Sequence, residues 1–119
     1  MAFTNDTKEA AALAVTARGN WISLHTADPG VTGASEATGG TPAYARKQTT
    51  WASGAVDGVV SGSSVPIDVP ADDYPFWGIW SAPTGGTFVG GFQLASPTGE
   101  LPGQTVVNVV PTVNVTSVG

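Results

Sequence analysis

Beyond residue 20, the sequence consists of short runs of β-branched and aromatic residues that are repeatedly interrupted by glycine and proline. The chain contains 16 glycines and nine prolines in 119 residues. Runs of this kind are typical of β-strands bounded by turns. We expect about eight strands, at residues 21–26, 46–51, 56–61, 65–69, 77–81, 87–94, 105–110 and 112–118.

The connections between these runs constrain the sheet type. A parallel sheet needs helical crossovers, and no second helical segment follows the first strand, so the strands should be antiparallel. The predicted fold is all-β: a jelly-roll-like antiparallel β-sandwich with one short N-terminal α-helix. Because dividing 119 residues would leave two cores too small to be stable, we expect one β-sandwich domain over residues 1–119.

The N-terminal segment has a helical period and good end signals, which predict a helix at about residues 7–18. Asp6 and Glu9 have the spacing of a capping box, and Arg18 with Gly19 supplies a C-terminal cation and a stop. The apolar positions of the segment are small, so its stripe should pack closely against a sheet or a neighbouring subunit. They are Ala10, Leu13, Ala14 and Ala17.

Turn chemistry supports two of the breaks between strands. Asp28-Pro29-Gly30 fits a turn in which proline fixes φ and glycine adopts a positive φ, and Gly85-Gly86 suits a tight hairpin. Residues 28–41 form a loop that is unusually long for a compact domain, which indicates either a contact element or a mobile segment.

The charge content excludes several function classes. The net charge is −5 with four basic residues, so the chain lacks the basic surface that nucleic-acid binding needs. Charged residues make up only 11% of the chain, which favours a surface partly buried in an assembly and a symmetric homo-oligomer. With no cysteine there is no disulfide or thiolate chemistry, and no apolar run is long enough to predict a membrane partner.

Catalytic and metal-binding patterns are not found. The single histidine, His25, has Ser23 on the same strand face, but no serine lies in a glycine-flanked nucleophile elbow. Asp72 and Asp73 are consecutive and should point to opposite sides. Asp28 and Glu36 lack the alternating acidic ligands of an EF-hand loop, so we predict neither a metal nor another cofactor, and no enzymatic activity.

Interaction residues are predicted in two places. In residues 76–80, Trp77 and Trp80 point to opposite faces, where they can serve as core, subunit interface or a sugar-stacking platform. Tyr44 and Arg46 share a face, where the arginine can pair with a carboxylate of the acidic loop. The candidate interaction residues are therefore Asp28, Glu36, Tyr44, Arg46, Trp77 and Trp80.

Several motifs together resemble small tail-fibre-like or minor virion structural proteins of actinobacterial phages. They are Leu24-His25-Thr26-Ala27-Asp28-Pro29-Gly30, Ala43-Tyr44-Ala45-Arg46, Gly78-Ile79-Trp80, Thr84-Gly85-Gly86-Thr87-Phe88 and Gly91-Phe92-Gln93-Leu94. The resemblance implies a β-sandwich-like particle component without catalysis, carried on the tail or as a decoration of the capsid.

We therefore expect a non-enzymatic bacteriophage virion protein that contacts major capsid or tail proteins. Residues 1–6 lack a secretory signal, so it should be made in the host cytoplasm and kept there until the virion assembles. The first alternative is a carbohydrate-binding module that recognises host cell-wall glycan through Trp77, Trp80 or Trp51. The second is a hydrolase centred on His25.

Overall fold

The structure, a computed structural model, describes residues 3–115 and places its strands at the short apolar runs. The elements are α1 (Asn5–Thr16), β1 (Trp21–His25), β2 (Lys47–Gln48), β3 (Trp51–Ala52), β4 (Val59–Gly62), β5 (Val65–Val69), β6 (Phe76–Trp80), β7 (Phe88–Gln93), β8 (Thr105–Val109) and β9 (Thr112–Asn114). They form three antiparallel sheets with the strand orders β2-β1-β6-β7, β3-β4-β9 and β5-β8. The predicted all-β, sandwich-like class with one N-terminal helix is confirmed.

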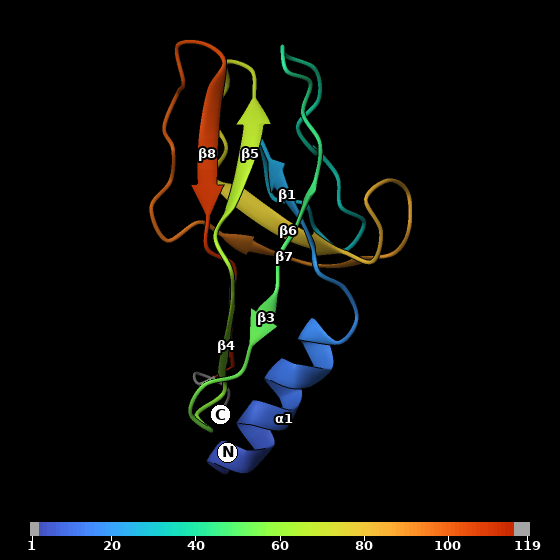
Figure 1. The fold of residues 1–119 in the computed structure, drawn as a ribbon, viewed down its shortest axis with the longest axis vertical. Helices are drawn as coiled ribbons and strands as arrows, with labels where there is room; N and C mark the ends of the chain where they lie inside the picture. The colour runs from blue at the N-terminus through green and yellow to red at the C-terminus, as the bar shows by residue number, and fades with distance from the viewer. Residues whose placement is uncertain (1–2, 116–119) are drawn as a thin grey trace.

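A long two-stranded ribbon runs along the 45 Å axis of the molecule (Figure 1). Strands β4 and β5 follow one another on one side of the ribbon, and β8 and β9 on the other, so β5 pairs with β8 and β4 with β9. At the junction the Gly62 amide donates to the Pro111 carbonyl (2.8 Å). The ribbon therefore joins two halves, one built around the four-stranded sheet and one around α1 (Figure 1).

The main core lies between the ribbon and one face of the four-stranded sheet. Strict alternation along β5 buries Val65, Ile67 and Val69 and leaves Pro66 exposed. In the four-stranded sheet Ile22 opposes Ile79 across β1 and β6, and both are fully buried. These residues belong to one buried cluster, which gives the sandwich its apolar interior.

The long loop after β1 covers the other face of this sheet. Gly33 has a φ of +76° and is buried against Trp80, whose ring a β-carbon at position 33 would meet at 2.4 Å. The Pro29 ring is buried against Gly91, where an added β-carbon would also clash with it. The loop is thus packed against the sheet within the molecule, and its role as a contact element for a partner stays a prediction.

The predicted turn at Asp28-Pro29-Gly30 is present, whereas the tight hairpin predicted at Gly85-Gly86 is a longer connection over residues 81–87. Gly30 has a φ of +59°, and its amide donates to Asp28 Oδ1 (2.9 Å). Gly85 and Gly86 have φ values of +61° and +74° in the connection between β6 and β7. Both turns therefore use glycine where a positive φ is required.

The helix departs from its prediction in three ways. It spans Asn5–Thr16 rather than residues 7–18, and Thr4, not Asp6, accepts the capping bond, from the Thr7 amide (3.2 Å). The predicted stripe is wrong, because its four members are exposed. The buried residues are instead Glu9, Ala12 and Thr16, since α1 packs on β4 and β9 through a face where Glu9 binds a backbone turn.

One predicted strand is divided in two. Residues 46–51 contain β2, which pairs with β1, and β3, which pairs with β4 in a different sheet. Between them Thr49 is buried, and its hydroxyl donates to the Ser63 carbonyl (2.8 Å). The chain changes sheets at this residue, which no local pattern indicates. The last predicted strand, residues 112–118, is present in part as β9, which ends at Asn114, and residues 116–118 of the prediction lie outside the described residues.

Within residues 3–115, α1 is the one helix, and it is too short to cross a membrane.

Candidate functional site

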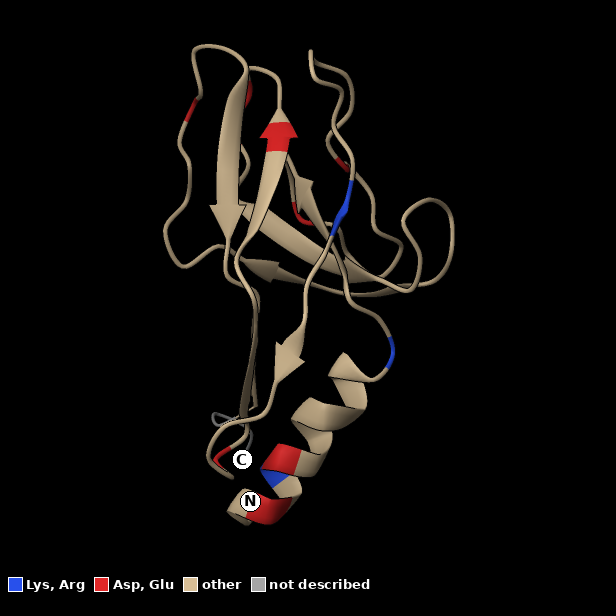
Figure 2. Cartoon of the chain, viewed as in Figure 1, with Lys and Arg blue, Asp and Glu red and all other residues tan. Residues whose placement is uncertain are grey.

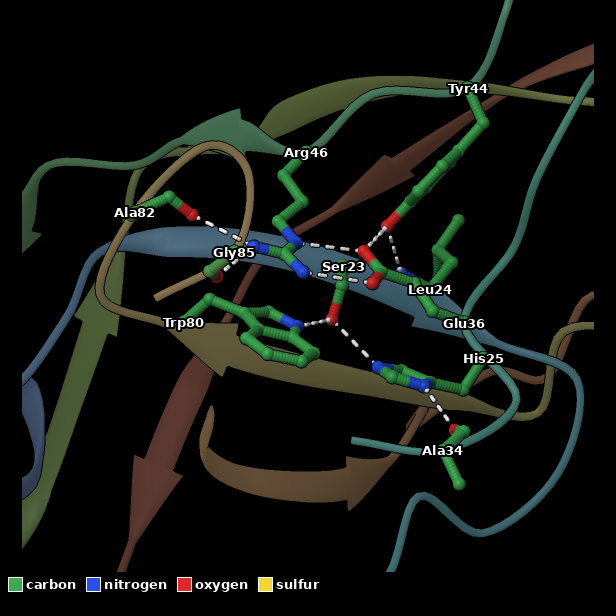
Figure 3. A network of polar contacts seen from close by, with 10 residues as sticks. All are labelled: Ser23, Leu24, His25, Ala34, Glu36, Tyr44, Arg46, Trp80, Ala82 and Gly85. Atoms are coloured by element: carbon green, nitrogen blue, oxygen red, sulfur yellow. Dashed lines mark hydrogen bonds and ion pairs between the residues drawn. The ribbon is translucent and has the colours of Figure 1, made fainter. Parts of the chain in front are cut away.

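A largely buried ion pair lies at the centre of a polar network on the loop-covered side of the four-stranded sheet (Figure 3). Arg46 contacts Glu36 with two nitrogens, Nε to Oε2 (2.8 Å) and Nη2 to Oε1 (2.9 Å). Only 8% of the Arg46 side chain and 20% of the Glu36 side chain are exposed. This two-point contact between largely buried groups is the strongest form of arginine–carboxylate pairing, and it confirms the predicted pairing of Arg46 with an acidic-loop carboxylate.

Arg46 also holds the hairpin between β6 and β7. Its Nη1 donates to the carbonyls of Ala82 (3.0 Å) and Gly85 (2.9 Å). The guanidinium carbon lies 3.7 Å from the centroid of the Trp80 ring, which is a close cation–π contact. One side chain therefore connects the loop that carries Glu36 to the hairpin that begins after Trp80.

Tyr44 completes the coordination of the carboxylate. Its hydroxyl donates to Glu36 Oε2 (2.7 Å) and accepts from the Leu24 amide of β1 (3.3 Å). Burial and the neighbouring carboxylate raise the pKa of Tyr44 well above its ordinary value. For Glu36, burial alone would raise the pKa, but the Arg46 and Tyr44 hydrogen bonds outweigh it and hold the pKa below its ordinary value.

A second chain of hydrogen bonds runs beneath the ion pair. Trp80 Nε1 donates to Ser23 Oγ (3.0 Å), Ser23 Oγ lies 2.7 Å from His25 Nε2, and His25 Nδ1 lies 2.8 Å from the Ala34 carbonyl. Burial lowers the pKa of His25, so the imidazole is neutral near pH 7. Since a carbonyl can only accept, the proton lies on Nδ1, and the Ser23 hydroxyl donates to Nε2.

The Ser23–His25 pair has the separation of a nucleophile and its base, but its surroundings are closed. Both residues are fully buried, and the Ser23 oxygen already accepts from Trp80. The Phe88 ring lies edge-on to His25, with centroids 5.9 Å apart. The pair therefore links β1, β6 and the covering loop, and both of its side chains are shielded from solvent.

A shallow hollow of about 300 Å³ opens beside the ion pair, between the loop and the hairpin. Its lining combines the buried charges with exposed threonine, alanine and proline side chains: Glu36, Ala37, Thr38, Tyr44, Ala45, Arg46, Pro83, Thr84 and Gly85. We call the four exposed side chains of this lining, those of Thr38, Ala45, Pro83 and Thr84, the braced surface.

The structure brings together four of the six candidate interaction residues: Glu36, Tyr44, Arg46 and Trp80. Asp28 lies in the same loop but is exposed and accepts from its own turn. Trp77 lies on the opposite sheet face, stacked on Phe92 with centroids 4.5 Å apart. The Ala82 and Gly85 carbonyls were not predictable from the sequence, because any residue supplies a carbonyl and no side-chain pattern marks it.

The tryptophans named for glycan stacking have their rings engaged within the protein. Trp77 and Trp80 are 4% and 9% exposed, and Arg46 covers one face of Trp80. Trp51 is half-buried and donates from Nε1 to the Gly19 carbonyl (2.9 Å). Within residues 3–115, no group of three or more histidine or acidic side chains is arranged to hold a metal ion.

The fold and this network define a small β-module whose buried polar groups hold two surface connections in place. Comparison with protein families places it among bacteriophage fibre proteins: the family model described as podophage GP4 fiber I protein gp80 matches residues 5–116. The chain belongs to this family. No curated protein and no solved structure gives a significant match. The resemblance to phage fibre-like proteins is thus confirmed, whereas the actinobacterial assignment stays a prediction.

Proposed function

We propose that this protein is a non-enzymatic structural component of a phage tail fibre, and that it acts through protein–protein contacts in the virion. The observation that carries the proposal is the fibre-family match over nearly the whole chain, residues 5–116. A fibre family favours the tail over the capsid, so of the two placements expected from the sequence we propose the tail.

The polar network supports a structural role. A catalytic site needs reactive groups that a substrate can reach, whereas Ser23 and His25 are fully buried. Arg46 uses its charge and four of its five N–H donors within the protein. Its bonds hold the hairpin against the loop, and the braced surface between them is therefore presented in one fixed shape.

A rigid surface suits assembly, because binding then costs little ordering of loops. We propose that the braced surface contacts another virion protein. Its exposed side chains are uncharged, as is usual for the central part of a protein interface.

The proposal is tested in virions. Mass spectrometry of purified particles should detect the chain, and electron microscopy of particles carrying a tagged copy should place it on the tail. Absence from the particle would contradict the proposal, and a position distributed over the capsid would replace tail attachment by decoration.

A matched pair of variants tests the braced surface. Thr84→Arg places a long cation on it, whereas Thr32→Arg makes the same change at an exposed loop position outside it. We expect Thr84→Arg to reduce incorporation into particles by at least about tenfold, the scale of a poorly placed charge in an interface, and Thr32→Arg to have no effect. Equal incorporation of both variants, with unchanged unfolding curves, would show that the surface makes no assembly contact.

A further inference from the structure

The four-stranded sheet has two very different edges. One edge is β2, which is only two residues long and carries Lys47. The other is β7, which has six residues and contains neither a charge nor a proline. Proteins protect sheet edges by shortening them or by adding charge, because an open edge can pair with another strand. By these criteria β2 is protected and β7 is open.

The main chain of β7 is suitable for such pairing. The Leu94 amide donates to the Pro75 carbonyl (2.9 Å) on the β6 side. Since ladder bonds alternate along an antiparallel strand, Gly91 and Gln93 turn their N–H and C=O groups away from β6. Both residues are exposed. The register shift near Trp80 affects only the start of β7, so residues 90–93 form a regular edge.

An uncharged groove lies beside this edge. It has a volume of about 340 Å³ and lies between β7 and β9, each of which ends its own sheet. The stacked rings of Trp77 and Phe92 contribute to its lining, together with Gln93, Leu94, Ala95, Val110, Thr112 and Asn114. None of these residues is charged, and Val110 is 60% exposed.

The charge distribution indicates what can bind here. The chain has a net charge of −5, and its acidic positions lie towards the ends and on the connections, while β7 carries none (Figure 2). A partner equally rich in carboxylates would meet no like charge along β7. A second copy of this chain is such a partner. Two identical edges are also complementary, because antiparallel pairing about a two-fold axis satisfies both at once.

We infer that β7 pairs with β7 of a second copy, which extends the four-stranded sheet across the dimer and covers the uncharged groove. The interface would consist of main-chain hydrogen bonds from residues 90–93 and apolar surface around Val110. This inference does not depend on the position of the chain in the virion, because the purified protein is sufficient to test it.

The first experiment measures mass by light scattering over a concentration series and the dissociation constant by analytical ultracentrifugation. The wild type should rise from the monomer mass of 11.9 kDa towards twice that value. Gln93→Glu and Val110→Asp place like charges across the interface and should each weaken association at least about tenfold. A wild type that stays at monomer mass at every concentration would overturn the inference.

Matched controls make the same chemical changes elsewhere. Gln48→Glu alters the opposite edge of the same sheet, and Val31→Asp alters a side chain that is 93% exposed. Both controls should associate like the wild type. Since all four positions are exposed, the unfolding midpoints should be unchanged. If the two groove variants also associate like the wild type, β7 is not the interface.

Hydrogen exchange locates the contact without any substitution. Amides of residues 90–93 should become more protected as concentration rises, whereas those of β2 should not. Leu13→Asp tests whether the exposed face of α1 forms the interface instead, because Leu13 is 42% exposed on that helix. Loss of association in that variant, with no protection at β7, would assign the interface to the helix and overturn the inference.

Discussion

Two glutamates with little exposed surface, one in each half of the molecule, hold surface turns by different means. Glu36 accepts from a guanidinium and a tyrosine hydroxyl. Glu9, on α1, is 5% exposed and accepts from two backbone amides through one oxygen, at Gly58 (2.9 Å) and Asp57 (3.2 Å). Its Oε2 is buried without a hydrogen-bond partner. The first carboxylate thus needs its charge for the contacts it makes, whereas the second acts mainly as an acceptor.

Removing the cation should produce the largest effect. Arg46→Met keeps an apolar side chain but leaves the Glu36 carboxylate without its ion-pair partner and the Ala82 and Gly85 carbonyls without a donor. Breaking a buried pair in this way costs about 3 kcal/mol. Urea unfolding measures the loss, with Arg18→Met, at an exposed position, as a control that should stay within about 0.5 kcal/mol. Equal stability of the two variants would contradict the importance of the ion pair.

A matched pair of isosteric substitutions tests the comparison directly. Glu36→Gln removes the charge and places amide donors against the donors of Arg46, so we expect a loss of about 2 kcal/mol. Glu9→Gln retains a carbonyl for the Gly58 and Asp57 amides and puts a donor where Oε2 has no partner. Its effect should be below about 1 kcal/mol. Chemical denaturation of both variants checks the order, and a larger loss at position 9 would reverse the comparison.

A smaller effect is expected from the tyrosine. Tyr44→Phe removes the donor to Glu36 and the acceptor for the Leu24 amide, which should cost roughly 1.5 kcal/mol. Tyr74→Phe is the control, since Tyr74 is fully buried but makes one hydroxyl bond, to the Pro70 carbonyl (2.9 Å). It should cost about 1 kcal/mol. If thermal unfolding shows the reverse order, the carboxylate does not depend on Tyr44.

The pH dependence should come mainly from the half that contains Glu36. His25 has an ordinary pKa of 6.5, which burial lowers in the folded protein. The unfolded chain therefore binds a proton below about pH 6.5 while the folded chain does not, so stability is complete above this pH and falls as the pH falls. His25→Asn should reduce the slope of stability between pH 6.5 and 5, measured by urea unfolding. The same slope in both proteins would exclude His25 as its source.

The sequence predicted what depends on local pattern and failed where distant contacts decide. Strand β5 matches its predicted range because its alternation is undisturbed, and glycine supplies the positive φ at Gly30 and Gly85, although the connection that contains Gly85 is longer than predicted. Glu9 has capping-box spacing, but the amides it binds lie about 50 residues along the chain. No window of sequence around the helix contains that information.

The candidate site was predictable to the same extent. Alternation placed Tyr44 and Arg46 on one face near an acidic loop, and the structure shows both on Glu36. The sequence could not choose between Asp28 and Glu36, because the choice depends on the Asp28 carboxylate being used by its own turn. Alternation correctly placed Trp80 on the strand face opposite Trp77. Its contact with Arg46 depends on how the chain folds, which the sequence pattern does not indicate.

The ribbon of β4–β5 and β8–β9 has a mechanical consequence. Both sides of the ribbon, β4–β5 and β8–β9, continue across the junction between the halves (Figure 1). A force applied at the α1 end therefore reaches the four-stranded sheet through two neighbouring segments. Two hydrogen-bonded segments resist bending and twisting far better than a single linker. We therefore expect the molecule to move as one rigid body about 45 Å long, without a hinge at the junction between its halves.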